Sequence, residues 1–142
     1  LVDIYYSKDG YSFDFSKLER YIKIALDCGI KYFEFPHLFT QWGSEHAPKI
    51  IVTENGKSYR RFGWETDADS AEYAEFLQSF LPAVKSFMKE KKLLDNCLFH
   101  ISDEPDEKHI ESYRKAVQTV LPLLKGCKTI DAENGILRIF PI

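Results

Sequence analysis

The sequence predicts an α/β fold in which helices alternate with strands that run parallel to one another. Three segments have apolar residues at helical spacing, and a short apolar, aromatic or β-branched run follows each of them. The expected elements occupy residues 16–28, 30–35, 70–91, 97–102, 106–125 and 128–132. Strands joined by crossover helices run parallel. An open doubly wound sheet and an arc of a (β/α)8 barrel both have this order, and periodicity does not choose between them.

A capping box and an apolar face predict the first helix. Ser16 is expected at the N-cap with Glu19 three residues later, so that the two side chains bond the exposed backbone N–H groups of the first turn. The apolar residues at helical spacing are Leu18, Tyr21, Ile22, Ala25 and Leu26. Gly29 then ends the helix, and Ile30–Phe35 is expected to follow as a buried strand.

Residues 36–69 interrupt the alternation with a predicted β-hairpin. Lys49–Thr53 and Lys57–Phe62 have strand character, and they flank Glu54-Asn55-Gly56. Asn-Gly between two such runs is the strongest short-range indication of a hairpin. Because the insertion is long for a connection between a strand and its following helix, we expect it to serve a binding site or a lid.

The second half of the chain repeats the unit of helix and strand. The helix over residues 70–91 has acidic residues early and lysines late, and Pro82 is expected to kink it or split it in two. Asp103-Glu104-Pro105 closes the next strand and opens the third helix, which Gly126 ends. Four strand-like segments or fewer complete neither architecture, so we expect the chain to be part of a larger fold.

Composition narrows the classes of function. At 142 residues the chain suits one domain, and a net charge of −3 without a basic stripe disfavours nucleic-acid binding. No apolar run approaches the roughly 18 residues of a membrane span, and the first residues do not resemble a signal peptide. We therefore expect a soluble chain that binds neither nucleic acid nor membrane. Its compartment and oligomeric state do not follow from the sequence, and its start at Leu1 suggests a piece of a longer protein.

The sequence contains no recognisable motif that binds a metal or a cofactor. Cys28, Cys97 and Cys127 are far apart, and we expect them to be buried thiols near the ends of elements. His37 and His46 form no H-E-x-x-H pattern, and no glycine-rich phosphate loop follows a strand. We predict no metal and no cofactor.

Polar residues gather where the predicted strands end, which is where both architectures place their active sites. The residues in question are Glu34, His37, Gln41, Trp42, His100, Asp103, Glu104 and Asp131. Two neighbouring carboxylates such as Asp103 and Glu104 tend to raise one pKa while the other group stays ionised, which is the division of labour that glycoside hydrolysis needs. The alternative is that Asp103 or Asp106 caps the following helix, with Glu104 favoured by the helix dipole.

The other strand-end residues also have two interpretations. On an ideal strand His100, Ser102 and Glu104 share one face, where His100 either contacts a substrate or is an inward histidine with its hydrogen bonds satisfied. The stretch His37–Trp42 suits hydroxyl recognition and stacking on a sugar ring, or Trp42 is merely a loop residue that covers the barrel mouth.

Three stretches of the sequence resemble a known family. His37-Leu38-Phe39-Thr40-Gln41-Trp42-Gly43, Leu93-Leu94-Asp95-Asn96 and Phe99-His100-Ile101-Ser102-Asp103-Glu104-Pro105 are similar to the catalytic region of glycoside hydrolase family 123. The string His100–Pro105 is also similar to the acidic strand-end sequence of family 20 hexosaminidases. The resemblance extends from about Asp3 to Ala132.

The resemblance implies the central part of a (β/α)8 TIM barrel with a β-hairpin insertion, incomplete in this chain. It implies a retaining β-N-acetylhexosaminidase that removes terminal β-N-acetylgalactosamine from glycans, with the substrate's own acetamido oxygen as nucleophile. Glu104 would be the general acid and base, and Asp103 would hold the acetamido N–H. Glu34, His37, Gln41, Trp42, His100 and Asp131 would contact the carbohydrate.

The same resemblance sets the expected domain organisation. Residues 1–142 form one partial catalytic barrel domain, in which 133–142 diverge from the family's usual continuation. Because a whole barrel is typically about 250 residues, we expect these residues alone to be poorly active or inactive. The alternative is a carbohydrate-binding or truncated remnant that keeps the pocket without turnover.

Overall fold

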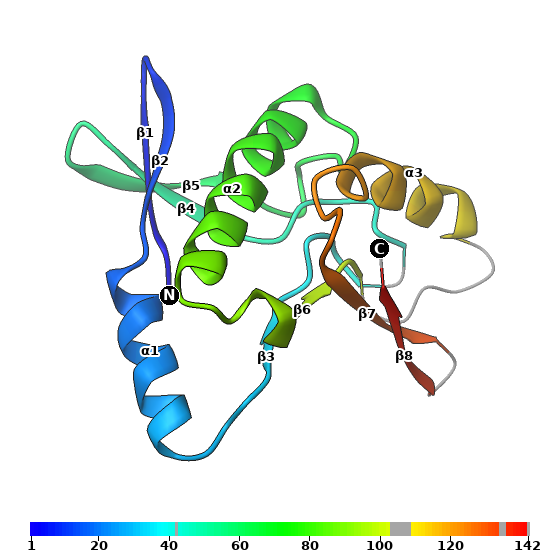
Figure 1. Cartoon of the computed structure of the whole chain (residues 1–142). Helices are drawn as coiled ribbons and strands as arrows, with labels where there is room; N and C mark the ends of the chain where they lie inside the picture. The colour runs from blue at the N-terminus through cyan, green and yellow to red at the C-terminus, as the bar shows by residue number, and fades with distance from the viewer. Residues whose placement is uncertain (42, 103–108, 134–135, 142) are drawn as a thin grey trace.

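A computed structural model describes residues 1–41, 43–102, 109–133 and 136–141, and side chains only up to residue 130. The described elements form two four-stranded sheets with helices beside them (Figure 1). Their bounds are β1 Asp3–Ser7, β2 Gly10–Asp14, α1 Ser16–Asp27, β3 Phe33–Phe35, β4 Ile50–Glu54, β5 Lys57–Phe62, α2 Ala71–Glu90, the 3-10 turn Leu94–Asn96, β6 Cys97–His100, α3 Ile110–Val120, β7 Lys128–Glu133 and β8 Ile136–Pro141.

The first sheet has the order β2-β1-β4-β5 and joins two hairpins. The predicted hairpin is confirmed, since β4 and β5 pair antiparallel and Asn55 and Gly56 both have positive φ, at 50° and 76°. A second hairpin, β1 with β2, precedes it and was not predicted. The two are joined by a parallel pairing of Tyr5 with Thr53. The insertion is therefore part of a sheet that begins at the start of the chain.

The second sheet has the order β3-β6-β7-β8 and confirms the predicted parallel strands. β3, β6 and β7 pair in parallel, and β8 returns antiparallel to β7, from Glu133↔Ile136 to Lys128↔Pro141. Part of the expected divergent tail is thus a strand. β3 begins three residues later than predicted because the N–H of Ile30 bonds the carbonyl of Ala25 and closes α1, with Gly29 at φ 85°.

The helices begin and end somewhat differently from the predictions. Phe15, not Ser16, is the N-cap of α1, and the Ser16 hydroxyl donates to Asp14 instead, so the predicted capping box is wrong. α2 continues across Pro82 as one helix, so the predicted split is also wrong. α3 ends at Val120 rather than near residue 125, because Pro122 brings no N–H to continue it. Its predicted start at about residue 106 lies outside the described residues.

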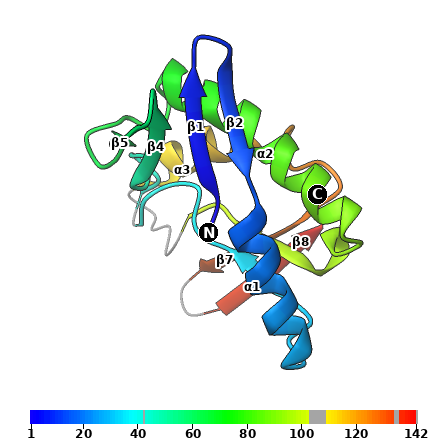
Figure 2. The ribbon, with the colours of Figure 1, turned by 90° about the vertical axis from the view of Figure 1, so that its left-hand side faces the viewer.

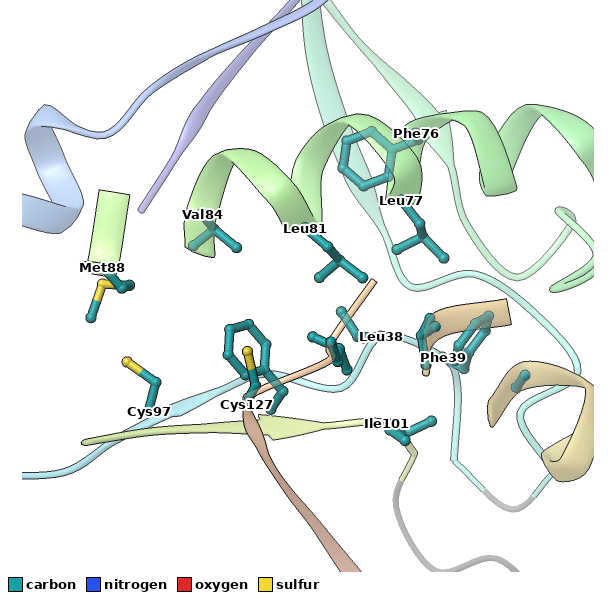
Figure 3. Packing of buried hydrophobic residues seen from close by; sticks show 14 of the residues in the cluster. Leu38, Phe39, Phe76, Leu77, Leu81, Val84, Met88, Cys97, Ile101 and Cys127 are labelled. Carbon is teal, nitrogen blue, oxygen red and sulfur yellow. The ribbon is translucent and has the colours of Figure 1, made fainter. Parts of the chain in front are cut away.

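The core lies around α2, which packs between the two sheets. Figure 2 shows β1 and β2 in front of this helix, where the ring of Phe13 lies 6.3 Å from that of Phe76 and 5.4 Å from that of Phe80. Toward the second sheet, α2 presents Leu77, Leu81, Val84 and Met88 to residues that include Leu38, Cys97 and Cys127 (Figure 3). One helix therefore supplies apolar contacts to both sheets. Cys28 is exposed, so the prediction of a buried thiol is wrong at that position.

Candidate functional site

The chain segments that follow β3 and β6 stay side by side beyond the strands. The N–H of Leu38 bonds the carbonyl of His100 at 3.0 Å, and the N–H of Phe39 bonds that of Ile101 at 3.0 Å. The backbone of Asp131 lies in β7, one residue beyond Ile130, which pairs with His100. The carboxyl ends of the three parallel strands therefore meet at one edge, as parallel pairing requires.

A carboxylate and two imidazoles lie together at this edge. Nδ1 of His100 lies 2.9 Å from Oε1 of Glu34, and the rings of His37 and His100 meet edge to face with centroids 4.5 Å apart. Because carboxylate oxygens accept hydrogen bonds, Nδ1–H of His100 is the donor of this contact. The His100 side chain is 7% exposed and that of Glu34 is 53% exposed. The buried imidazole is thus oriented by a carboxylate that faces solvent.

This polar group lies on the face of the second sheet opposite α2. In the register of β3 and β6, Glu34 pairs with Leu98, whereas Phe35 pairs with Phe99 and stacks on its ring at 4.8 Å. Alternation along each strand puts Glu34 and His100 on one face and Phe35 and Phe99 on the other. The predicted common face of His100, Ser102 and Glu104 stays a prediction, because Ser102 lies beyond the end of β6 and Glu104 lies outside the described residues.

Three hydroxyl groups secure the loop after β3. The Ser102 hydroxyl donates to the carbonyl of Thr40 at 2.9 Å, the Thr40 hydroxyl accepts from the N–H of His46 at 3.2 Å, and the Tyr73 hydroxyl donates to the carbonyl of Leu38. Burial raises the pKa of Tyr73, which keeps it a neutral donor. In the sequence, the helical spacing of Tyr73 indicates only a residue on the apolar face of α2, and nothing local points to Leu38.

The other predicted site residues are placed in part. Asp103, Glu104 and Trp42 lie outside the described residues, although Asp103 follows directly on Ser102. Gln41 is an exposed residue of the turn that follows Thr40. For Asp131 the structure describes the backbone only.

A cavity of about 690 Å³ runs along the open edge of β3. All of residues 33–38 line it, which includes both faces of the strand, together with mostly apolar side chains of β4, α1 and α2. Glu34 and His37 supply polar groups to this lining. The candidate site and the cavity therefore share the end of β3.

In the described part of the chain, no three His, Cys, Asp or Glu side chains come together in a way that could hold a metal ion. None of the helices described is long and apolar enough to cross a membrane.

The chain has parallel strands joined by helices, and polar side chains lie at the carboxyl ends of these strands. This combination is typical of α/β domains, whose active sites lie at the carboxyl ends of parallel strands. The chain belongs to the family of glycoside hydrolase 123 catalytic domains, whose model matches residues 1–138. The family resemblance inferred from the strand-end strings is confirmed.

A solved structure has a similar fold. It is a family 123 glycoside hydrolase from Clostridium perfringens, described in a structural analysis of glycolipid glycan hydrolysis. The TM-score is 0.66 at 14% sequence identity, and the match covers 93% of this chain and 23% of that chain. The present chain thus spans about a quarter of the length of that protein. No curated protein matches the sequence.

Proposed function

We propose that the chain is the central part of the catalytic domain of a retaining, substrate-assisted β-N-acetylhexosaminidase that removes terminal β-N-acetylgalactosamine from glycans. The observation that carries the proposal is the group of Glu34, His37 and His100 at the strand edge, in a chain of this family. Within this group, His100 lies three residues before Asp103 in the sequence. The glycolipid glycan named for the Clostridium perfringens protein supports a glycan substrate.

The proposed reaction uses the two neighbouring carboxyl groups for different tasks. Glu104 protonates the leaving oxygen and then activates water, as a general acid and base. Asp103 accepts a hydrogen bond from the acetamido N–H and stabilises the positive charge that develops when the acetamido oxygen attacks the anomeric carbon. Because the nucleophile belongs to the substrate, no second carboxylate is needed across the ring, and the reaction needs no metal or cofactor.

The strand-edge residues bind the sugar in this proposal. Glu34 fixes the ring of His100, so that His100 and His37 present imidazole groups of defined orientation to substrate hydroxyls. Gln41, Trp42 and Asp131 complete the contacts, with the indole of Trp42 as a stacking surface for the sugar ring.

The same proposal includes an arc of a (β/α)8 barrel. Three parallel strands with α2 and α3 as crossover helices support it, as does the cavity along the open edge of β3, where a further strand would pair. The domain of which residues 1–142 are a part would then need the remaining strands for full activity.

The test compares two substrates in the full-length protein that carries this chain. Aryl β-N-acetylgalactosaminide should be cleaved at least about 100-fold faster than aryl β-galactoside, because only the first carries the internal nucleophile. Glu104→Gln and Asp103→Asn should each lower kcat by about 10²–10⁴. Glu111→Gln, an exposed glutamate of α3 paired with Arg114, is the matched control and should keep full activity.

Two results would contradict this function in different ways. Equal cleavage of the two substrates would exclude substrate assistance. Sugar binding without cleavage of either substrate would favour the alternative, a carbohydrate-binding or inactive remnant domain.

A further inference from the structure

A second cavity, of about 290 Å³, lies between α3 and the two loop segments that flank the β4–β5 hairpin. It shares no residue with the cavity along β3. We call it the α3 cavity, and its lining residues are Ser44, Glu45, His46, Asp67, Ala68, Asp69, Ser112, Lys115, Ala116 and Thr119. None of them belongs to the strand-edge group proposed above.

Ser44 is the unusual residue of this lining. Its φ of 53° is in the left-handed region, where a side chain costs free energy and glycine is preferred. The residue is 0% exposed, and its hydroxyl has no hydrogen-bond partner in the described part of the chain. Glycine would relieve both costs. Strained backbone and unsatisfied buried hydroxyls are concentrated at binding sites, where a ligand completes the hydrogen bonds.

Two ion pairs of the α3 cavity are loose, whereas the hydroxyls of Ser112 and Thr119 donate to the backbone carbonyls of His109 and Lys115. Nδ1 of His46 lies 3.7 Å from Oδ1 of Asp67, and Nζ of Lys115 lies 3.9 Å from Oδ2 of Asp69. Both distances exceed a normal hydrogen bond, so these groups keep the capacity to bond something placed between them. Nδ1 of His46 is buried and makes no hydrogen bond within the described residues.

The chemistry of the lining indicates the class of ligand. The carboxylates of Glu45, Asp67 and Asp69 outnumber the ammonium of Lys115, which disfavours phosphate, sulfate or another anion. Lys115 in turn disfavours a simple cation. Acceptors, donors and hydroxyls interspersed around one small cavity match the alternating hydroxyl groups of a neutral sugar. Its volume lies near the lower end of ligand pockets, about 300 Å³, and suits a single ring.

We propose that the α3 cavity binds one neutral pyranose unit through Ser44, Asp67 and Lys115, separately from the sugar that reacts at the strand edge. The proposal rests on the proposed function in one respect, namely that a glycan is the molecule that brings such a unit to this chain. A free monosaccharide has the same chemistry, and the experiment distinguishes the two sources.

Hydrogen-exchange mass spectrometry of the full-length protein tests the proposal. Methyl β-galactoside should slow exchange in segments 43–47 and 66–70, whereas methylammonium chloride at the same concentration should not. A galactose-terminated tetrasaccharide should bind at least about tenfold more tightly than the methyl glycoside if the natural ligand is a unit of a glycan. Equal affinities would assign the site to a free monosaccharide and overturn the part of the proposal that involves a glycan.

Ser44→Gly separates a binding role from a structural one. This variant should raise Tm, because it removes the left-handed side chain and the unsatisfied hydroxyl, and it should weaken binding of the methyl glycoside at least about tenfold. Asp67→Asn should weaken binding without raising Tm. Ser58→Ala, on the exposed β5 strand, is the control and should leave the affinity unchanged.

Several outcomes would overturn the proposal. They are protection by methylammonium alone, no protection by either sugar, and a Ser44→Gly variant that loses stability while it keeps its affinity. The Glu104→Gln variant makes the two hypotheses separable, since it should lose hydrolysis and keep the protection of segment 43–47. Protection in a protein without glycosidase activity would contradict the proposed function only, and activity without protection would contradict the α3 cavity only.

Discussion

Tyr73 connects the longest helix of the chain to the loop that carries the candidate site. It lies in the first turn of α2, is 1% exposed, and its hydroxyl donates to the backbone carbonyl of Leu38. Leu38 follows His37 and bonds the carbonyl of His100 through its own N–H. The Tyr73 hydroxyl therefore links the core helix α2 to the backbone of the loop that pairs with the strand edge at His100.

Tyr73→Phe tests this connection at the scale of one residue. The change keeps the ring and removes the donor to a buried carbonyl, so the free energy of unfolding should fall by about 1–3 kcal/mol. Urea denaturation followed by circular dichroism measures it. Tyr21→Phe, at an exposed position of α1, is the matched control and should change stability by less than about 0.5 kcal/mol. Equal effects of the two changes would rule out the hydrogen bond as a source of stability.

At the scale of elements, α2 keeps a proline inside a continuous helix. Pro82 has no N–H for the carbonyl of Gln78, and its ring crowds the preceding turn. The helix is buried against both sheets over residues that include Leu81 and Val84 on either side of the proline. Packing on two sides therefore outweighs the local preference to break.

Pro82→Ala should stabilise the chain by about 1–3 kcal/mol, because alanine restores a backbone hydrogen bond and suits a helix interior, while the unfolded chain gains some entropy. Thermal and urea denaturation measure the change. Lys89→Ala in the last turn of the same helix is the control, expected to change little. A loss of stability in Pro82→Ala would mean that the sheets require the helix shape that proline imposes.

The two hairpins show how far local patterns predict an element. Asn55-Gly56 between two strand-like runs predicted β4 and β5 to within a residue or two, because both residues have the positive φ that the tight turn requires. Lys8 and Asp9 form the turn between β1 and β2, and Gly10, at φ 98°, is the first residue of β2, so Asp9-Gly10 would have indicated that hairpin too. The capping box failed because the Ser16 hydroxyl finds Asp14, two residues earlier, as its acceptor.

For the whole molecule, the layer of α2 against the second sheet buries two thiols. Cys97 in β6 and Cys127 before β7 are both buried, and Figure 3 shows Cys97 near Met88. Burial raises the pKa of Cys97 to about 12 and also raises that of Cys127. Both thiols are therefore neutral in the folded chain over a range of pH in which unfolded thiols ionise.

Stability should accordingly decline on the alkaline side. Between pH 9 and about 12 the unfolded chain binds fewer protons at Cys97 than the folded chain, so the free energy of unfolding falls as pH rises, by up to about 1.4 kcal/mol per pH unit. Urea denaturation at a series of pH values measures the slope. Cys97→Ala should make it shallower, whereas Cys28→Ala, at an exposed position, should leave it unchanged. An unaltered slope in Cys97→Ala would refute burial of this thiol as the cause.

The sequence alone determined the features that depend on neighbours in the chain. These are the apolar faces of the helices, the Asn-Gly turn, and the alternation of helices with strands that predicts parallel pairing. They also include the polar sequence stretches at the strand ends that indicate the family. Each follows from backbone geometry or local hydrogen bonding, which a stretch of a few residues specifies by itself.

Only the tertiary structure decided which distant groups meet. The bond from His100 to Glu34 spans 66 residues, that from Tyr73 to Leu38 spans 35, and the pairing of Tyr5 with Thr53 joins two hairpins. Ser44 gives no sign in the sequence of its left-handed backbone or its cavity. Such contacts depend on the packing free energy of the whole chain, since local propensities are too weak to determine which remote segments come together.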